Sequence, residues 1–217
     1  MYTKHQWKGG HHFPFQYVQY LPKDFDPNQT YPLVFFLHGA GERGDDLETV
    51  CRHGFMKHVR ETGKEYPFIF IAPQCPAEKY WACYTESLFA FLDFLCETLP
   101  IDRDRIYLTG LSMGGTGSFM LAMAEPERFA ALVPVCGSGI VWYAEKLVGF
   151  PVYMYHGDCD DTVPVQESVT MLAKINEKGG NAQLKILNGC RHNAWDFAYA
   201  GDELTQWMMV QKRAQKA

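Results

Sequence analysis

The stretch Gly110-Leu111-Ser112-Met113-Gly114 follows an apolar run at 106–109 and opens a run of small residues at 114–124. The first run is typical of a buried strand, and the second of a helix that packs closely on a sheet. A serine that projects from a sharp strand-to-helix turn has crowded backbone, so the positions two before and two after it need small residues. The pattern predicts a nucleophile, Ser112, with the backbone N–H of Met113 at a helix N-terminus facing a developing oxyanion. Ordinary glycine-rich turns share this pattern, so the surrounding sequence must decide.

Similar short apolar runs, rich in β-branched and aromatic residues, recur along the chain between Pro and Gly residues. They predict buried strands of a mostly parallel sheet. A polar–apolar alternation near the start predicts an antiparallel hairpin strand at the sheet edge. In chain order the predicted strands are 15–21 (the antiparallel edge strand), 33–37, 68–72, 106–109, 132–136, 152–156 and 183–187.

Helical patterns alternate with these strands. Apolar residues recur at three- and four-residue spacing over 88–99 and stop before Pro100, and further helices are expected at 114–124, 166–178 and 202–212. This alternation predicts an α/β fold, a mostly parallel central sheet with helices on both faces and functional groups in loops at the carboxyl ends of the strands. The length of 217 residues and the lack of linkers or repeats predict a single domain, 1–217.

Composition narrows the function classes. The formal net charge is −5, the pI is about 5.9 and no Lys/Arg cluster occurs, so nucleic acid is not expected as a partner. No segment has the length of apolar chain that a membrane span requires. The first twenty residues lack the apolar stretch of a secretory signal, which predicts a cytoplasmic protein unless a signal has been removed. The 7 cysteines, an odd number without C-x-x-C spacing, favour reduced thiols over disulfides or a zinc site.

A serine hydroxyl is a weak nucleophile at neutral pH, so Ser112 requires a histidine base and a carboxylate that orients it. The segment 156–164, His-Gly-Asp-Cys-Asp-Asp-Thr-Val-Pro, directly follows a predicted strand and offers three carboxylates. The segment 189–195, Gly-Cys-Arg-His-Asn-Ala-Trp, follows the last predicted strand and offers His192. The order serine, acid, histidine is the one found in α/β hydrolases.

With these motifs the chain resembles the α/β-hydrolase superfamily, and within it the compact carboxylesterase, phospholipase and feruloyl-esterase-like group. The resemblance runs from Leu33 to Trp207. It rests on four motifs in order, which are the L-H-G-x-G turn at 37–41, the elbow at Ser112, the H-G-x-x-D-x-x-V-P loop at 156–164 and the G-x-x-H loop at 189–192.

The resemblance implies the individual site residues. Matching the acid loop puts the catalytic carboxylate at Asp160, and the alternatives Asp158 and Asp161 are then turn residues that bond nearby backbone. Ala40 is implied as the second oxyanion donor beside Met113, and the choice between Ala40 and Gly41 stays open at this stage.

Substrate contacts are less well indicated. Trp81, Tyr84, Trp142 and Trp195 fall in or beside the predicted loops and could form an aromatic wall, with Trp81 favoured, although core packing explains them equally well. For Arg43 a solvated or salt-bridged side chain is favoured over contact with a substrate carboxylate or phosphate. Many relatives insert a cap before the strand at 152, where this chain has only a short stretch, so little or no cap is expected.

Together these features predict a serine hydrolase that cleaves carboxylic esters of small or extended soluble substrates through a Ser-His-Asp triad and an acyl-enzyme. A thioesterase or small-peptide hydrolase with the same triad is one alternative, and a non-catalytic ligand-binding homologue is another. The triad needs no cofactor, and the sequence has no metal-ligand spacing.

Overall fold

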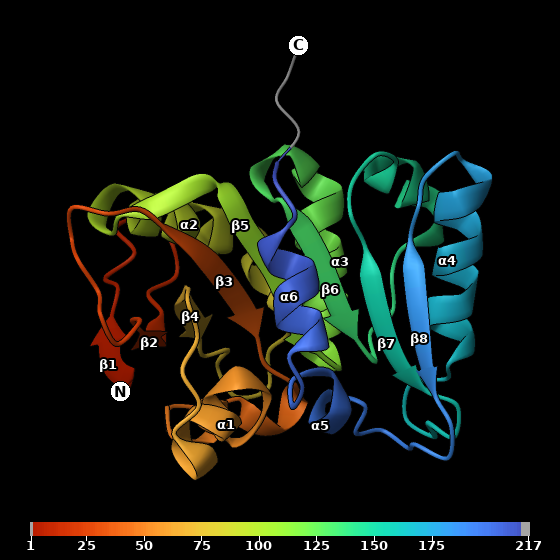
Figure 1. Ribbon diagram of the computed structural model, residues 1–217, viewed down its shortest axis with the longest axis horizontal. Helices are drawn as coiled ribbons and strands as arrows, with labels where there is room; N and C mark the ends of the chain where they lie inside the picture. The colour runs from red at the N-terminus through yellow and green to blue at the C-terminus, as the bar shows by residue number, and fades with distance from the viewer. Residues whose placement is uncertain (1, 214–217) are drawn as a thin grey trace.

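The computed structural model of the protein describes residues 2–213. Eight strands form one sheet in the order β1-β2-β4-β3-β5-β6-β7-β8, and the helices cover it (Figure 1). The strands are β1 (Tyr2–Gln6), β2 (Gln16–Tyr20), β3 (Tyr31–Leu37), β4 (Ile69–Pro73), β5 (Ile101–Leu111), β6 (Ala131–Val135), β7 (Tyr153–Gly157) and β8 (Gln183–Leu187). The α-helices are α1 (Gly54–Thr62), α2 (Thr85–Thr98), α3 (Met113–Ala124), α4 (Gln166–Glu177), α5 (Trp195–Ala198) and α6 (Glu203–Met209).

The sheet is mostly parallel, as predicted. From β4 to β8 every neighbouring pair is parallel, so the carboxyl ends of these strands meet at one edge. At the other end β2 pairs antiparallel with both β1 and β4. The prediction of an edge strand at 15–21 is therefore wrong in one respect, because β1 covers β2 and is itself the edge.

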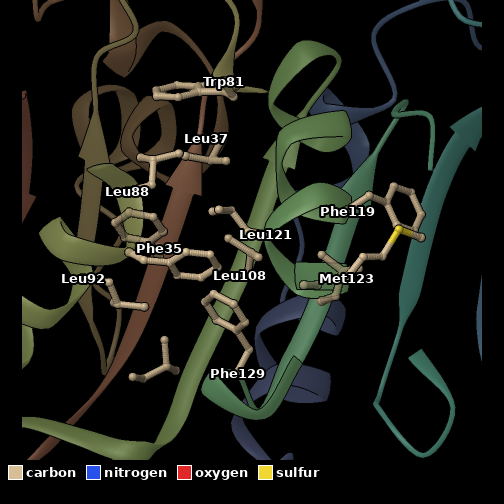
Figure 2. Close-up of a cluster of buried hydrophobic side chains, with 14 of the residues drawn as sticks. Phe35, Leu37, Trp81, Leu88, Leu92, Leu108, Phe119, Leu121, Met123 and Phe129 are labelled. Atoms are coloured by element: carbon tan, nitrogen blue, oxygen red, sulfur yellow. The ribbon is translucent and has the colours of Figure 1, made fainter. Parts of the chain in front are cut away.

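The core has one layer on each face of the sheet, because successive side chains of a buried strand point to opposite faces. In β3, Phe35 joins the cluster under α2, α3 and α4, whereas Phe36 joins the cluster under α1, α5 and α6. Figure 2 shows the first cluster, where Leu88 and Leu92 of α2 and Phe119 of α3 lie over the strands. Helices on both faces confirm the predicted layer order.

Some elements differ from the predictions. The helix expected at 202–212 is shorter, because α6 ends at Met209. Between β6 and β7 the chain forms one short 3-10 helix, Val141–Leu147, which packs against α3 and α4 and makes no separate cap. Within residues 2–213 no helix is both long and apolar enough to cross a membrane.

Candidate active site

Three strand ends bring the predicted triad together. Ser112 follows β5, Asp160 lies in the loop after β7, and His192 lies in the loop after β8. All three strands run in the same direction, so these loops lie at the same edge of the sheet (Figure 1).

The backbone at Ser112 is unusual. Its φ of 52° and ψ of −118° lie outside the regions that non-glycine residues favour. A Cβ on Gly114 would lie 1.9 Å from the carbonyl oxygen of Leu37, and one on Gly110 would lie 2.4 Å from that of Gly114. Both glycines are therefore required sterically, since they let the start of α3 lie directly against the end of β3.

A chain of hydrogen bonds joins the three side chains. His192 Nε2 lies 2.8 Å from Ser112 Oγ, and His192 Nδ1 lies 2.7 Å from Asp160 Oδ2. With the proton on Nδ1, His192 donates to Asp160 and accepts from the hydroxyl of Ser112 at Nε2. This is the arrangement that lets an imidazole remove a proton from a serine hydroxyl.

Asp160 is held by backbone as well as by His192. Its Oδ1 accepts the N–H groups of Thr162 and Val163, both at 2.9 Å. Burial by itself would raise the pKa of Asp160, but the hydrogen bonds from His192 and from these two N–H groups outweigh it and hold the pKa below its usual value. The carboxylate stays ionised beside the imidazole.

The other two carboxylates of this loop have different partners. Asp158 is exposed and accepts the N–H of Gly189 at 2.7 Å, while Asp161 forms an ion pair with Arg191. Both contacts lie within or between loops, as expected if Asp158 and Asp161 are turn residues. Of the three, Asp160 is the one that hydrogen-bonds to His192.

His38 and His156 are buried beneath the loops that they open. His38 accepts the N–H of Cys75 at Nε2 (2.9 Å) and donates from Nδ1 to the carbonyl of Gly39 (2.6 Å), and burial lowers its pKa to about 4. His156 lies 2.7 Å from Ser168 Oγ and 2.8 Å from the carbonyl of Val163. Both histidines thus fix loop backbone.

The two residues predicted as oxyanion donors each begin a helix. Met113 begins α3, and Ala40 begins a 3-10 helix, Ala40–Glu42. First-turn N–H groups have no acceptor within their own helix, which leaves them available to a ligand. The contact between Gly114 and the end of β3 brings these two helix starts together.

An apolar cavity of about 370 Å³ opens beside Ser112. Trp81, Met113, Met120 and Val163 contribute to its lining. Trp81 is only 2% exposed, and its Nε1 donates to the carbonyl of His38 at 3.0 Å, so it supports the turn before Ala40 as well as the cavity wall. The volume falls in the range of small-molecule sites.

The other aromatic candidates lie elsewhere. Tyr84 packs on Phe13, with ring centroids 4.5 Å apart, and Trp142 is 89% exposed. Trp195 packs edge-on against His192 at 5.2 Å. Neither Tyr84 nor Trp142 lines the cavity beside Ser112.

Of the two environments predicted for Arg43, solvated or salt-bridged, the structure does not show the salt bridge. Its Nε donates to the carbonyl of Ala40 (2.9 Å), its Nη1 donates to that of Lys79 (3.1 Å), and its guanidinium lies 5.3 Å from the ring centroid of Tyr80. No carboxylate of the described residues pairs with it. Arg43 thus ties the turn at Ala40 to the cavity rim.

One group within residues 2–213 has metal-binding side chains in close proximity. A ligand atom from each of Cys136, Asp160 and His192 lies within 4.8 Å of the other two. Two of these are the hydrogen-bonded acid and histidine described above, and burial raises the pKa of the Cys136 thiol to about 12. The proximity is explained by the triad and a buried neutral thiol.

Sequence reasoning missed two residues near the site. Glu42 is buried directly after the turn at Ala40, and His53 lies 3.6 Å from it (Nε2 to Oε1). Their positions relative to each other depend on the fold of 40–53, which holds two short 3-10 helices without a periodic apolar signal. A buried acid inside a glycine-rich turn has no sequence signature.

Comparison with known proteins gives a family. Residues 14–149, more than half of the 217-residue chain, match the family described as "Putative esterase". A probable feruloyl esterase C of Aspergillus niger is 30% identical over 172 residues, which are 76% of this chain and 62% of that protein. A probable feruloyl esterase C of Aspergillus clavatus is 29% identical over 178 residues, which are 79% of this chain and 64% of that protein. The chain thus matches less than two thirds of the length of these relatives.

Solved structures give the fold. A thermostable esterase superposes with a TM-score of 0.83 at 31% identity, over 98% of this chain and 63% of that chain. A mutant of the feruloyl esterase module from Clostridium thermocellum, complexed with sinapinate, superposes with a TM-score of 0.77 at 15% identity, over 100% of this chain and 90% of that chain. The second likeness shows the fold alone. The chain has the α/β-hydrolase fold, as the sequence motifs predict.

Proposed function

Because the chain belongs to this esterase family, we propose that it is a serine hydrolase that cleaves carboxylic esters. The nucleophile is Ser112, the general base is His192 and the orienting carboxylate is Asp160. The observation that carries the proposal is the continuous hydrogen-bond chain from Ser112 Oγ through both nitrogens of His192 to Asp160.

The steps of the reaction follow from this series of hydrogen bonds. His192 Nε2 removes the proton of Ser112 as Oγ attacks the ester carbonyl carbon, and the carbonyl oxygen becomes an oxyanion. The N–H groups of Ala40 and Met113 stabilise that charge. When the intermediate collapses, the ester C–O bond breaks, and His192 returns the proton to the leaving alcohol. Water then repeats the sequence on the acyl-enzyme and releases the acid.

The cavity beside Ser112 receives an apolar part of the ester. Its lining by Trp81, Met113, Met120 and Val163 favours a flat or branched apolar group over a charged one. The relatives named as feruloyl esterases make an aromatic acyl group the first candidate. The short segment between β6 and β7 leaves the site open, which suits small esters and esters on extended soluble chains.

A direct test is hydrolysis of p-nitrophenyl esters from acetate to decanoate, together with methyl ferulate, by the wild type and by Ser112→Ala. The wild type turns over at least one ester, and the variant retains only the small rate that the oxyanion donors supply, a loss of about 10⁴-fold or more. Equal turnover by both proteins would rule out Ser112. Turnover of thioesters or amides in place of esters would move the proposal to another leaving group.

The cytoplasm is the compartment that the cysteines favour. All 7 cysteines are free, and Cys51, Cys75, Cys136 and Cys190 are buried. Free thiols persist in a reducing compartment. Alkylation of the protein in a lysate of its own cells, with a mass shift for each reactive thiol, would test this.

A further inference from the structure

Glu42 is a buried carboxylate for which the proposed reaction has no use. It is 6% exposed, it ends the 3-10 helix that Ala40 begins, and its Oε2 has no hydrogen-bond partner among the described residues. A Cβ built on Gly39 would lie 3.0 Å from this Oε2. The carboxylate therefore rests against the backbone of the turn at 37–41, which is called the oxyanion turn here because it carries the proposed donor Ala40. Burying a carboxylate with one oxygen left without a hydrogen bond is costly, which indicates that it serves a purpose here.

A line of contacts runs from Glu42 to the catalytic histidine. His53 Nε2 lies 3.6 Å from Glu42 Oε1, and the His53 ring lies 5.4 Å from the ring of Trp195. Trp195 in turn packs edge-on against His192, at 5.2 Å and an interplanar angle of 88°. The turn at Ala40 and the proposed general base are therefore connected through two side chains, His53 and Trp195.

The same line holds an unusual number of unsatisfied polar atoms. Six buried side-chain atoms of residues 2–213 lack a hydrogen-bond partner, and three of them are Glu42 Oε2, His53 Nδ1 and Trp195 Nε1. Such atoms are rare in folded proteins and concentrate where function or ordered water requires them. Their position beside the proposed active site favours function.

We propose that Glu42 and His53 form an ion pair that positions the oxyanion turn and, through Trp195, the ring of His192. Both are positioning residues, since neither touches the reacting atoms. When this pair is ionised, it leaves no uncompensated negative charge beside the oxyanion that forms near Ala40. The inference rests on the proposed esterase function and adds to it a second charged pair.

Other charged groups also lie near this pair, among them Arg43, which donates to the carbonyl of Ala40. Burial raises the pKa of Glu42 above its ordinary value, and the electrostatic effects of His53 and Arg52, which lower it, offset the rise only in part. Next to Trp195, Asp196 pairs with Lys57 at 3.1 Å. In addition, His38 lies beside the turn, and burial lowers its pKa to about 4, so it is neutral near pH 7.

The backbone of Glu42 has anchors that do not involve its carboxylate. Its carbonyl accepts Gln74 Nε2 at 2.9 Å and Thr49 Oγ1 at 3.2 Å. Replacing the carboxylate with an amide leaves both contacts in place. Glu42→Gln therefore changes the charge of the pair while the 3-10 helix keeps its support.

The experiment is a double-mutant cycle of Glu42→Gln and His53→Gln on the full chain, with p-nitrophenyl acetate as substrate. Each single variant lowers kcat by about tenfold, with KM within about twofold of the wild type, because the oxyanion donor shifts only in part. The double variant is no slower than the slower single variant, because either change alone breaks the pair. In all three variants the pH profile of kcat/KM lacks the component that ionisation of Glu42 and His53 adds in the wild type. Glu48→Gln, the same change in a half-exposed acid that pairs with Lys4, is the matched control and leaves kcat unchanged.

Two results would overturn the inference. One is a kcat for both single variants within twofold of the Glu48→Gln control, and the other is a double variant whose loss is the product of the two single losses. If Glu42→Gln does not fold, His53→Gln carries the test through kcat and the pH profile, since that side chain is 31% exposed and tolerates the change. An inactive wild type would defeat the proposed function, and the inference with it, whereas an active wild type with unchanged variants defeats only the inference.

Discussion

At the scale of single residues, backbone fixes Asp160, the proposed acid of the triad. Asp160 uses Oδ1 for the N–H groups of Thr162 and Val163 and Oδ2 for His192, so its orientation is set before any substrate arrives. Preorganisation of this kind spares the reaction the cost of ordering the base. The orientation depends on a carboxylate, which can accept from all three donors at once.

Asp160→Asn therefore removes far more activity than Asp158→Asn. An amide cannot accept the Nδ1 proton of His192 through its NH₂ end, so the wrong tautomer is favoured and kcat falls by about 10³-fold or more. Asp158 Oδ1 accepts the N–H of Gly189, a contact that asparagine keeps, and kcat stays within about twofold. Steady-state kinetics of both variants would decide, and the reverse ranking would show that the acid is misassigned.

Asp160 also gives a pH dependence to stability. Its pKa in the folded state is lowered from the ordinary 3.8, so its ionised form stabilises the protein above that pH and the contribution is lost as pH falls through the folded-state pKa. Below pH 4 the free energy of unfolding thus falls more steeply for the wild type than for Asp160→Asn. Urea titrations of both proteins at several acidic pH values measure this, and parallel slopes would contradict it.

At the scale of the elements, the buried strands and long helices were predictable because their signal is local. The run at 183–187 predicts β8 with the observed bounds, and the stripe at 88–99 predicts α2 within three residues at its start. The edge strand β1 was not predicted, because Tyr2–Gln6 is largely exposed and polar. This segment forms a strand because it pairs with β2, and its sequence pattern does not show that pairing.

The contact between α3 and β3 is the one on which the site depends most. Gly114→Ala would place a methyl group 1.9 Å from the carbonyl oxygen of Leu37, so the helix start must move away from the turn. We expect a loss of at least about 2 kcal/mol in the free energy of unfolding. In Gly201→Ala the nearest atom lies 4.0 Å away, which makes it the control. Denaturant titration of both variants measures the difference, and equal stabilities would contradict the close contact.

At the scale of the whole molecule, one sheet carries everything that the site needs. Its parallel strands end at one edge, so Ser112, Asp160 and His192, which are far apart in sequence, come together there. The residues proposed as the triad were predictable because each of them lies in a motif at a strand end. The pair of Glu42 and His53 was not, since it depends on how irregular loops pack on the finished fold.

The prediction of a single domain, 1–217, is tested by heating. Both core layers pack on the same sheet, so we expect them to unfold together. Calorimetry should then show a single transition whose measured and van't Hoff enthalpies agree. Differential scanning calorimetry at two scan rates would establish this. Two resolved transitions would show that part of the chain unfolds by itself.

The central claim is that Ser112 is a nucleophile activated by His192, and labelling with an active-site-directed fluorophosphonate tests it most directly. The wild type is predicted to gain one adduct, which peptide mapping by mass spectrometry places on Ser112, and His192→Ala is predicted to react at least about 10²-fold more slowly. An adduct on another residue, no adduct at all, or equal rates for the two proteins would contradict the account.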